Sequence, residues 1–206
     1  MLRIQQALET LSPPAILKNT RLHTARAEVN SEINRCARNR PWFSGDGRIA
    51  LIRVTSGAQI HPVIATRWTS TLKSNRLEIV MCANDGYLPG VTNFSCRVAK
   101  CAKDRANGSV GAIAGEHGQA VESGINIIEV LKDYASREPG LLESMGDDFA
   151  RGHKEASGGI VRTVDFERLW NIMQKSEGTA TESPPRKKRK AEETQRNTLD
   201  AWVKKG

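Results

Sequence analysis

The sequence predicts an α/β (α+β) domain: a mixed-sheet module with flanking helices, an N-terminal connector helix and a disordered C-terminal tail. Aliphatic and β-branched runs typical of buried strands alternate with segments whose apolar residues recur at helical spacing. The expected order of core elements is strand, helix, strand, strand, helix, strand. From Ser176 onward the chain is polar and nearly free of aliphatic residues, which predicts disorder. We therefore divide it into a connector (1–45), a core domain (46–175) and a tail (176–206).

The connector is expected to be helical in two pieces. The first, LRIQQALETL (2–11), ends before Pro13 and Pro14, because proline cannot donate a helical hydrogen bond. The second piece precedes Pro41 and the turn SGDG (44–47), and it carries apolar residues at near-helical spacing: Leu17, Leu22, Ala25, Val29, Ile33 and Cys36. This pattern is typical of a connector or a helix that faces a partner.

The core is expected to consist of three strands, two helices and a final strand that continues into a helix. In chain order the corresponding segments are RIALIRV (48–54), IHPVIATRWTSTLKS (60–74), RLEIVMCAN (76–84), VTNFSCRVA (91–99), INIIEVLKDYAS (125–136) and GGIVRTVDFERLWNIMQ (158–174). The glycine-rich stretch 108–124 lacks the spacing of a dinucleotide-binding motif, so we expect an extended loop there. A second glycine-rich loop is expected within 149–161.

Composition restricts the classes of partner. The chain has 206 residues and a formal net charge of +8, which favours a polyanion such as nucleic acid. No run of eighteen apolar residues occurs, so we expect no membrane partner. The four cysteines form no CxxC pair and are expected to be reduced thiols: Cys36, Cys82, Cys96 and Cys101.

The segment FARGHKEASGGIV (149–161) combines cations and a histidine with residues that lack side-chain bulk. Glycines let a backbone approach another molecule closely, and backbone N–H groups in such a loop bind phosphate. The pattern fits either a mobile turn or a cradle for phosphate or nucleic acid. The candidate residues in this segment are Arg151, Gly152, His153, Lys154, Ala156, Ser157, Gly158 and Gly159.

The motifs DGRIALIRV, IHPVIA, NFSCR, INIIEVLK and ARGHKEASGG, in this order, resemble the DHH-associated domain. This is the C-terminal substrate-binding domain of DHH-family phosphoesterases, among them the RecJ-type single-strand exonucleases, and the resemblance covers roughly residues 46–170. It implies a phosphate contact at Arg97, with Ser95 beside it. It also implies contacts to nucleic acid or nucleotide at Gly152, His153, Ala156, Gly158 and Gly159.

Other readings of these and neighbouring residues stay open. Arg97 is also compatible with a surface salt bridge, and His61, before Pro62, with a helix start or the edge of the core. The cations that precede the first glycine-rich stretch fit a track for a nucleic-acid strand or an ordinary solvated charge run: Lys100, Lys103 and Arg105.

The chain departs from the DHH pattern in lacking a DHH triplet. Its histidines are dispersed, with no carboxylate cluster at ligand spacing: His23, His61, His117 and His153. We therefore expect no catalytic residue, metal site or cofactor in this chain. Mn²⁺ or Mg²⁺ would belong to a DHH domain supplied elsewhere, and the isolated chain is expected not to hydrolyse nucleic acid.

The tail carries a basic cluster, PPRKKRK (184–190). Such a cluster in a disordered segment is typical of a nuclear localisation signal read by an import receptor, and a nonspecific DNA-binding patch is the competing interpretation. The signal comprises Arg186, Lys187, Lys188, Arg189 and Lys190. We expect a nuclear protein.

The terminal segment NTLDAWVKK (197–205) places Leu199, Trp202 and Val203 within one helical turn, as in a short docking helix. It resembles the peptide that binds the sliding clamp PCNA. That motif has a glutamine where this chain has Arg196, and it ends in two aromatic residues. The alternative is an unrelated docking peptide.

Taken together, the sequence predicts a nuclear single-strand nucleic-acid-binding domain with a role in DNA repair. One alternative is part of a metal-dependent exonuclease or phosphodiesterase that a separate DHH domain completes. Another is a clamp-recruited adaptor that does not bind nucleic acid.

Overall fold

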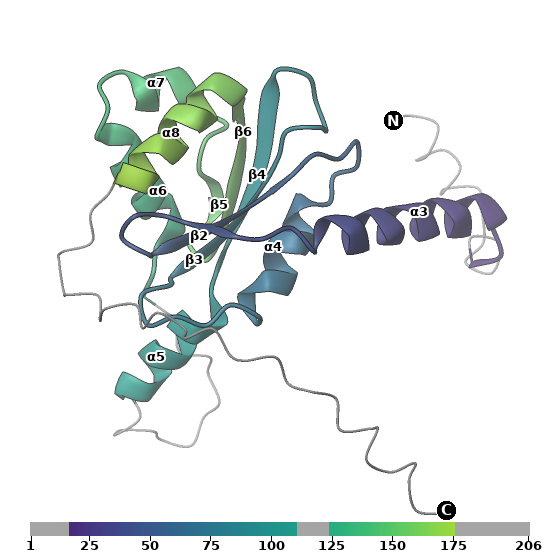
Figure 1. Ribbon diagram of the computed structural model, residues 1–206, viewed down its shortest axis with the longest axis horizontal. Helices are drawn as coiled ribbons and strands as arrows, with labels where there is room; N and C mark the ends of the chain where they lie inside the picture. The colour runs from purple at the N-terminus through teal and green to yellow at the C-terminus, as the bar shows by residue number, and fades with distance from the viewer. Residues whose placement is uncertain (1–16, 111–123, 176–206) are drawn as a thin grey trace, which may run out of the picture.

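A six-stranded mixed sheet organises residues 17–110 and 124–175, the part of the chain that the computed structural model describes (Figure 1). β2 and β3 pair in parallel, and the other neighbouring strands pair antiparallel. In spatial order the strands are β1 (Trp42–Phe43), β2 (Ile49–Val54), β3 (Ile79–Asn84), β4 (Val91–Val98), β6 (Ala156–Arg162) and β5 (Arg151–His153). The predicted mixed sheet with flanking helices is confirmed.

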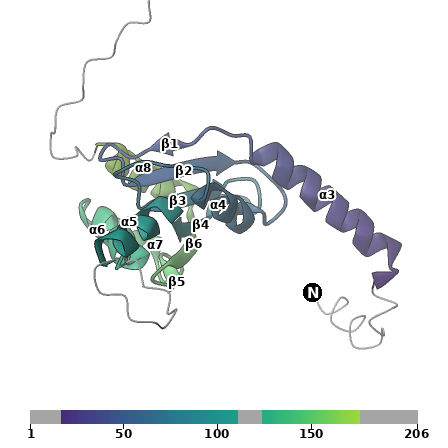
Figure 2. The ribbon, with the colours of Figure 1, turned by 90° about the horizontal axis from the view of Figure 1, so that it is seen from below.

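Helices cover both faces of this sheet. The shorter α4 packs on β3 and β4, whereas α6 and α8 contact β4 and β6 from the opposite side (Figure 2). None of the helices in 17–110 and 124–175 is long and apolar enough to cross a membrane. The helices are α3 (Thr20–Cys36), α4 (His61–Thr69), α5 (Lys100–Val110), α6 (Ile127–Ser136), α7 (Leu141–Met145) and α8 (Thr163–Lys175).

The expected N-terminal helix is present as α3, which extends away from the sheet (Figure 1). Asn19 caps it, since its side chain accepts hydrogen bonds from the backbone N–H groups of Arg21 and Leu22. Only Ile33 and Cys36 of α3 are buried, so the helix is anchored to the body at its C-terminal end.

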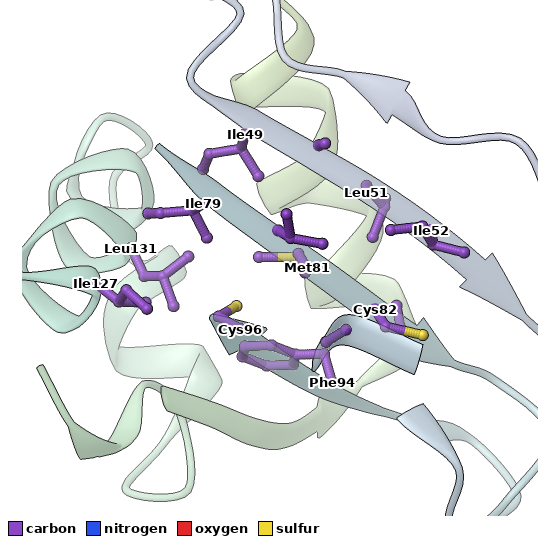
Figure 3. Packing of buried hydrophobic residues seen from close by; sticks show 14 of the residues in the cluster. Ile49, Leu51, Ile52, Ile79, Met81, Cys82, Phe94, Cys96, Ile127 and Leu131 are labelled. Carbon is purple, nitrogen blue, oxygen red and sulfur yellow. The ribbon is translucent and has the colours of Figure 1, made fainter. Parts of the chain in front are cut away.

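The core follows the alternation of side chains along the strands. β3 is buried on both faces, as expected for a central strand that reads as a continuous apolar run. On one face, Met81, Cys96 and Phe94 of the sheet meet Ile127 and Leu131 of α6 (Figure 3). The other face packs against α4, which contributes its buried residues Ile64 and Ala65.

The connection between β2 and α4 is held by the side chain of Asn84, the last residue of β3, which is fully buried. Its Oδ1 accepts hydrogen bonds from the N–H groups of Ser56 (2.9 Å) and Gly86 (3.1 Å). Its Nδ2 donates to the carbonyls of Ser56 and Ala58, both at 3.0 Å. All four bonds that an asparagine amide readily makes are present, so the loop before α4 is tied to the sheet.

Three of the predicted elements need correction. The loop expected within 149–161 is, from Arg151 onward, a β-hairpin of β5 and β6, because pairing with β4 supplies hydrogen bonds that outweigh the low strand propensity of glycine. The stretch expected as a loop from 108 begins inside α5, which ends at Val110. The helix expected over 60–74 ends at Thr69. The helical piece at 2–11 and the tail 176–206 lie outside the described residues.

Asn84→Ala should lower the free energy of unfolding by about 2–4 kcal/mol, because it leaves buried backbone groups of the β2–α4 connection without partners. Urea denaturation measures this change. The control is Asn39→Ala, which removes one exposed hydrogen bond to the Arg53 carbonyl and should cost less than about 1 kcal/mol. Equal losses in the two variants would contradict the role given to Asn84.

Candidate functional site

The predicted site lies on one face of the sheet, across β4, β6 and β5. Arg97 is directly opposite Ala156, which is in turn opposite His153. Two residues away, Ser95 is opposite Gly158, and Gly158 is opposite Arg151. Residues in register on neighbouring strands project from the same face. The long arginine of β4 therefore lies beside the smallest side chains of β6, and the missing bulk hollows the sheet surface.

This hollow is a cleft of about 430 Å³ between the hairpin, β4 and the start of α4. Apart from His153 and Lys154, it brings together all the site residues predicted on β4 and the hairpin. His153 is exposed on β5, where its Nδ1 accepts a hydrogen bond from the N–H of Glu155 (3.3 Å). Lys154 lies in the turn, and its carbonyl accepts from the N–H of Ile127 (2.8 Å). The predicted residues that line the cleft are Ser95, Arg97, Arg151, Gly152, Ala156, Ser157, Gly158 and Gly159.

Arg97 is held in position by its own strand. Its Nη1 donates to the Ser95 Oγ and to the Cys96 carbonyl, both at 2.8 Å. Within the described part of the chain, the half-buried guanidinium forms no ion pair with a carboxylate, so the salt-bridge interpretation has no partner there. A positioned guanidinium with remaining N–H donors suits an anion that is planar or tetrahedral, such as phosphate.

Arg151 differs from Arg97 because a carboxylate accompanies it. Its Nη1 lies 2.7 Å from Asp148 Oδ1, and both side chains are exposed at the mouth of the cleft. A surface pair of this kind is weak and is screened by salt. An incoming anion can therefore compete for Arg151, while Asp148 reduces the net positive charge at the entrance.

Two residues of the cleft were not predicted from the sequence as site residues. His61 Nδ1 and Asn93 Oδ1 are buried and have no hydrogen-bond partner among the described residues, and both side chains line this cleft. Period-two alternation along β4 places Asn93 on the face of Ser95 and Arg97, so this residue had a detectable signal. His61 begins α4, as the helix-start interpretation expected, and nothing in the local sequence places it beside β4.

Burial, reinforced by the positive charge of Arg97, lowers the pKa of His61 from 6.5 to about 4. The imidazole is therefore neutral at neutral pH and offers one N–H and one lone pair. A neutral histidine beside an arginine can bond to a sugar hydroxyl, a base edge or a phosphate oxygen without adding charge. Together with the amide of Asn93, it equips the cleft with directional polar contacts as well as a cation.

The glycines of β6 are required by close packing. A Cβ added to Gly158 would lie 2.4 Å from the Phe94 carbonyl oxygen, and one added to Gly159 would lie 2.5 Å from the Asp148 carbonyl oxygen. The Phe94 ring is also close to Gly159, and its centroid lies 5.7 Å from that of Phe166 on α8. The two glycines thus allow the hairpin to pack closely against β4, and they also leave space for the cleft.

A metal centre does not assemble in the described ranges. Residues 17–110 and 124–175 contain no group of three or more His, Cys, Asp or Glu side chains that could hold a metal ion. His61 and His153 lie on α4 and β5, and His23 lies on the protruding α3. The residues present there do not fit the Mn²⁺ or Mg²⁺ site of a two-metal phosphoesterase.

No protein-family model and no curated protein matches the chain. Its fold has a distant structural similarity to the pGpG-specific phosphodiesterase PggH from Vibrio cholerae, with 14% identity and a TM-score of 0.39 over 81% of this chain and 44% of that one. A second similarity is to the C-Ala domain of Aquifex aeolicus alanyl-tRNA synthetase, with 12% identity and a TM-score of 0.34 over 66% of this chain and 98% of that one. The chain thus spans less than half the length of the phosphodiesterase. Both are likenesses of fold alone.

The two signals predicted in the tail lie outside the described residues. These are the basic cluster at 184–190 and the docking peptide of Leu199, Trp202 and Val203. Import-receptor binding, nuclear localisation and clamp binding therefore stay predictions.

The depressed pKa of His61 predicts a pH dependence of stability. Below pH 6.5 the unfolded chain takes up a proton at this residue while the folded chain does not, so stability falls from about pH 6.5 to about pH 4. The contribution approaches about 1.4 kcal/mol per pH unit. In urea denaturation at a series of pH values, His61→Gln should flatten this slope. An unchanged slope in His61→Gln would contradict the assignment.

Gly158→Ala should destabilise the protein by about 1–3 kcal/mol, because its Cβ meets the backbone of β4 and neither strand can give way cheaply. Thermal unfolding measures the loss. Gly57→Ala is the matched control, since a Cβ at that position meets no atom within 4 Å. A Gly158→Ala variant as stable as Gly57→Ala would refute the packing argument.

Proposed function

We propose that the cleft binds the phosphate and the adjoining nucleoside of a single-stranded nucleic acid. One coincidence carries the proposal: the two unpartnered buried polar atoms of the described residues, on His61 and Asn93, belong to the same cleft as Arg97. A buried polar group without a partner is costly, and a ligand that completes its hydrogen bonding removes that cost. The net charge of +8 and the resemblance of the sequence motifs to the DHH-associated domain support the same ligand class.

In this proposal each residue has a distinct part. Arg97, oriented by Ser95 and the Cys96 carbonyl, donates its remaining N–H groups to phosphate oxygens. Ala156 and Gly158 leave room for the ligand beside it. Asn93 and His61 form directional hydrogen bonds to the sugar or the base, and Arg151 exchanges its exposed partner Asp148 for the ligand.

The proposal is tested by fluorescence anisotropy with labelled single-stranded DNA and RNA of the same sequence. Arg97→Ala should weaken binding about 10- to 100-fold, as expected for the loss of a charge-assisted contact. It should also reduce the slope of log K against log salt by about 0.7. Arg38→Ala is the matched control, because this exposed arginine of the segment after α3 removes the same charge away from the cleft.

Asn93→Ala separates binding from structure. Because Oδ1 of Asn93 has no partner among the described residues, the variant should keep wild-type stability while it loses affinity. Undiminished binding in both Arg97→Ala and Asn93→Ala would refute the proposal, as would a binding loss that only follows a loss of stability.

A further inference from the structure

Two more hollows follow the cleft along the surface, and each shares lining residues with the hollow before it. The second, of about 310 Å³, lies along the later turns of α4 and shares Arg97 with the cleft. The third, of about 640 Å³, lies between the end of α4 and the start of α5, and it shares Ser70 and Lys100 with the second. Because each hollow shares lining residues with the next, the three lie in a row, and this row is called here the α4 groove.

The order of the hollows follows α4 from its first residue to its last. His61 lines the cleft, Thr66 and Thr69 line the second hollow, and Leu72, just past the helix, lines the third. The nine residues of α4 span about 14 Å at about 1.5 Å per residue. A stacked strand of about 3.4 Å per nucleotide covers that length with about four nucleotides. We expect a single nucleotide to occupy only the cleft.

The charge of the α4 groove fits a polyanion along this path. Arg97 stands between the first and second hollows, and Lys100 stands between the second and third. Lys73, in the third hollow, and Lys100 are exposed and form no ion pair within the described part of the chain. Lys103 is paired with Glu155 at 2.6 Å, so it contributes less charge.

Hydroxyl groups and a backbone junction line the rest of the α4 groove. Ser70 presents a hydroxyl that can donate to a phosphate oxygen, and such a contact positions a strand without reading its bases. The hydroxyls of Thr66 and Thr69 donate instead to the carbonyls of Pro62 (2.9 Å) and Thr66 (2.7 Å). Arg105 donates to the carbonyls of Ser74 (2.8 Å) and Leu77 (2.7 Å), which ties α5 to the loop that follows α4. At the far end of the groove, α5 follows directly on β4 (Figure 1). The bonds of Arg105 therefore join α5 to the segment between α4 and β3.

We propose that the strand held in the cleft continues along the α4 groove, so that the ligand is an oligonucleotide of about four nucleotides with a second phosphate contact at Lys100 and Lys73. This inference rests on the proposed function of the cleft. It assigns the α4 groove, rather than the exposed tip of the hairpin, as the path of the strand. In this proposal Lys100 contacts the nucleic-acid strand and is not an ordinary solvated charge.

A length series tests this path. Labelled single strands of one, two, four and eight nucleotides are titrated against the wild-type chain and against the double variant Lys73→Ala/Lys100→Ala. Wild-type affinity should rise up to about four nucleotides and then level off. The double variant should bind the mononucleotide as the wild type does, bind the octanucleotide about tenfold more weakly, and show a salt slope for the octanucleotide reduced by about 1.4, or about 0.7 per lysine.

Lys132→Ala is the matched control, because this exposed lysine of α6 lies on the opposite side of the sheet and should affect no length. The path along the α4 groove is refuted if the mononucleotide binds but affinity does not rise with length, or if the double variant binds the octanucleotide like the wild type. Failure of the mononucleotide to bind, with Arg97→Ala having no effect on longer strands, instead refutes the proposed function of the cleft. The two failures are therefore distinguishable.

Discussion

The fold of the candidate site depends on the buried amide of Asn84. Three of its four hydrogen bonds tie the β2–α4 connection to the end of β3, and this sets where α4 begins. The fourth is with Gly86, in the turn that follows β3. Because α4 begins there, His61 lies beside β4 and Arg97 instead of facing solvent. One desolvated asparagine, which would be expensive if any of its bonds were missing, thus determines the position of one wall of the cleft.

The opposite wall depends on the absence of side chains. Ala156 and Gly158 stand across from Arg97 and Ser95, and a larger residue at either position would project into the space that the guanidinium faces. The same glycine-rich strand, β6, also lies close to Phe94. The ring of Phe94 packs against α8 on the opposite face of the sheet. The small residues of β6 therefore have two effects: they leave space for the cleft on one face of the sheet, and they allow close packing around Phe94 on the other.

Much of the architecture was predictable from local patterns. Aliphatic and β-branched runs identified β2, β3 and β4, and helical spacing identified α4 and α6, because burial on one or both faces leaves a period in the sequence. In the hairpin of β5 and β6, the residues before Gly158 were wrongly expected to be a loop, since glycine, alanine and serine carry no strand signal of their own, whereas the strand from Gly158 onward was predicted. Its strands exist because β4 offers a ladder of hydrogen bonds, which is a nonlocal fact.

The sequence by itself determined which chemical groups are available: an arginine in FSCR, a segment without bulky side chains in GHKEASGG, and an excess of positive charge. Only the tertiary structure decided how these groups meet. The register of β4 with β6 places Arg97 beside Ala156, and the loop held by Asn84 brings His61 to the same cleft. The two hollows that follow the cleft along α4 to Lys100 also arise from packing. The physical reason is that strand registers and helix positions are set by contacts between residues far apart in the chain, which local propensities do not encode.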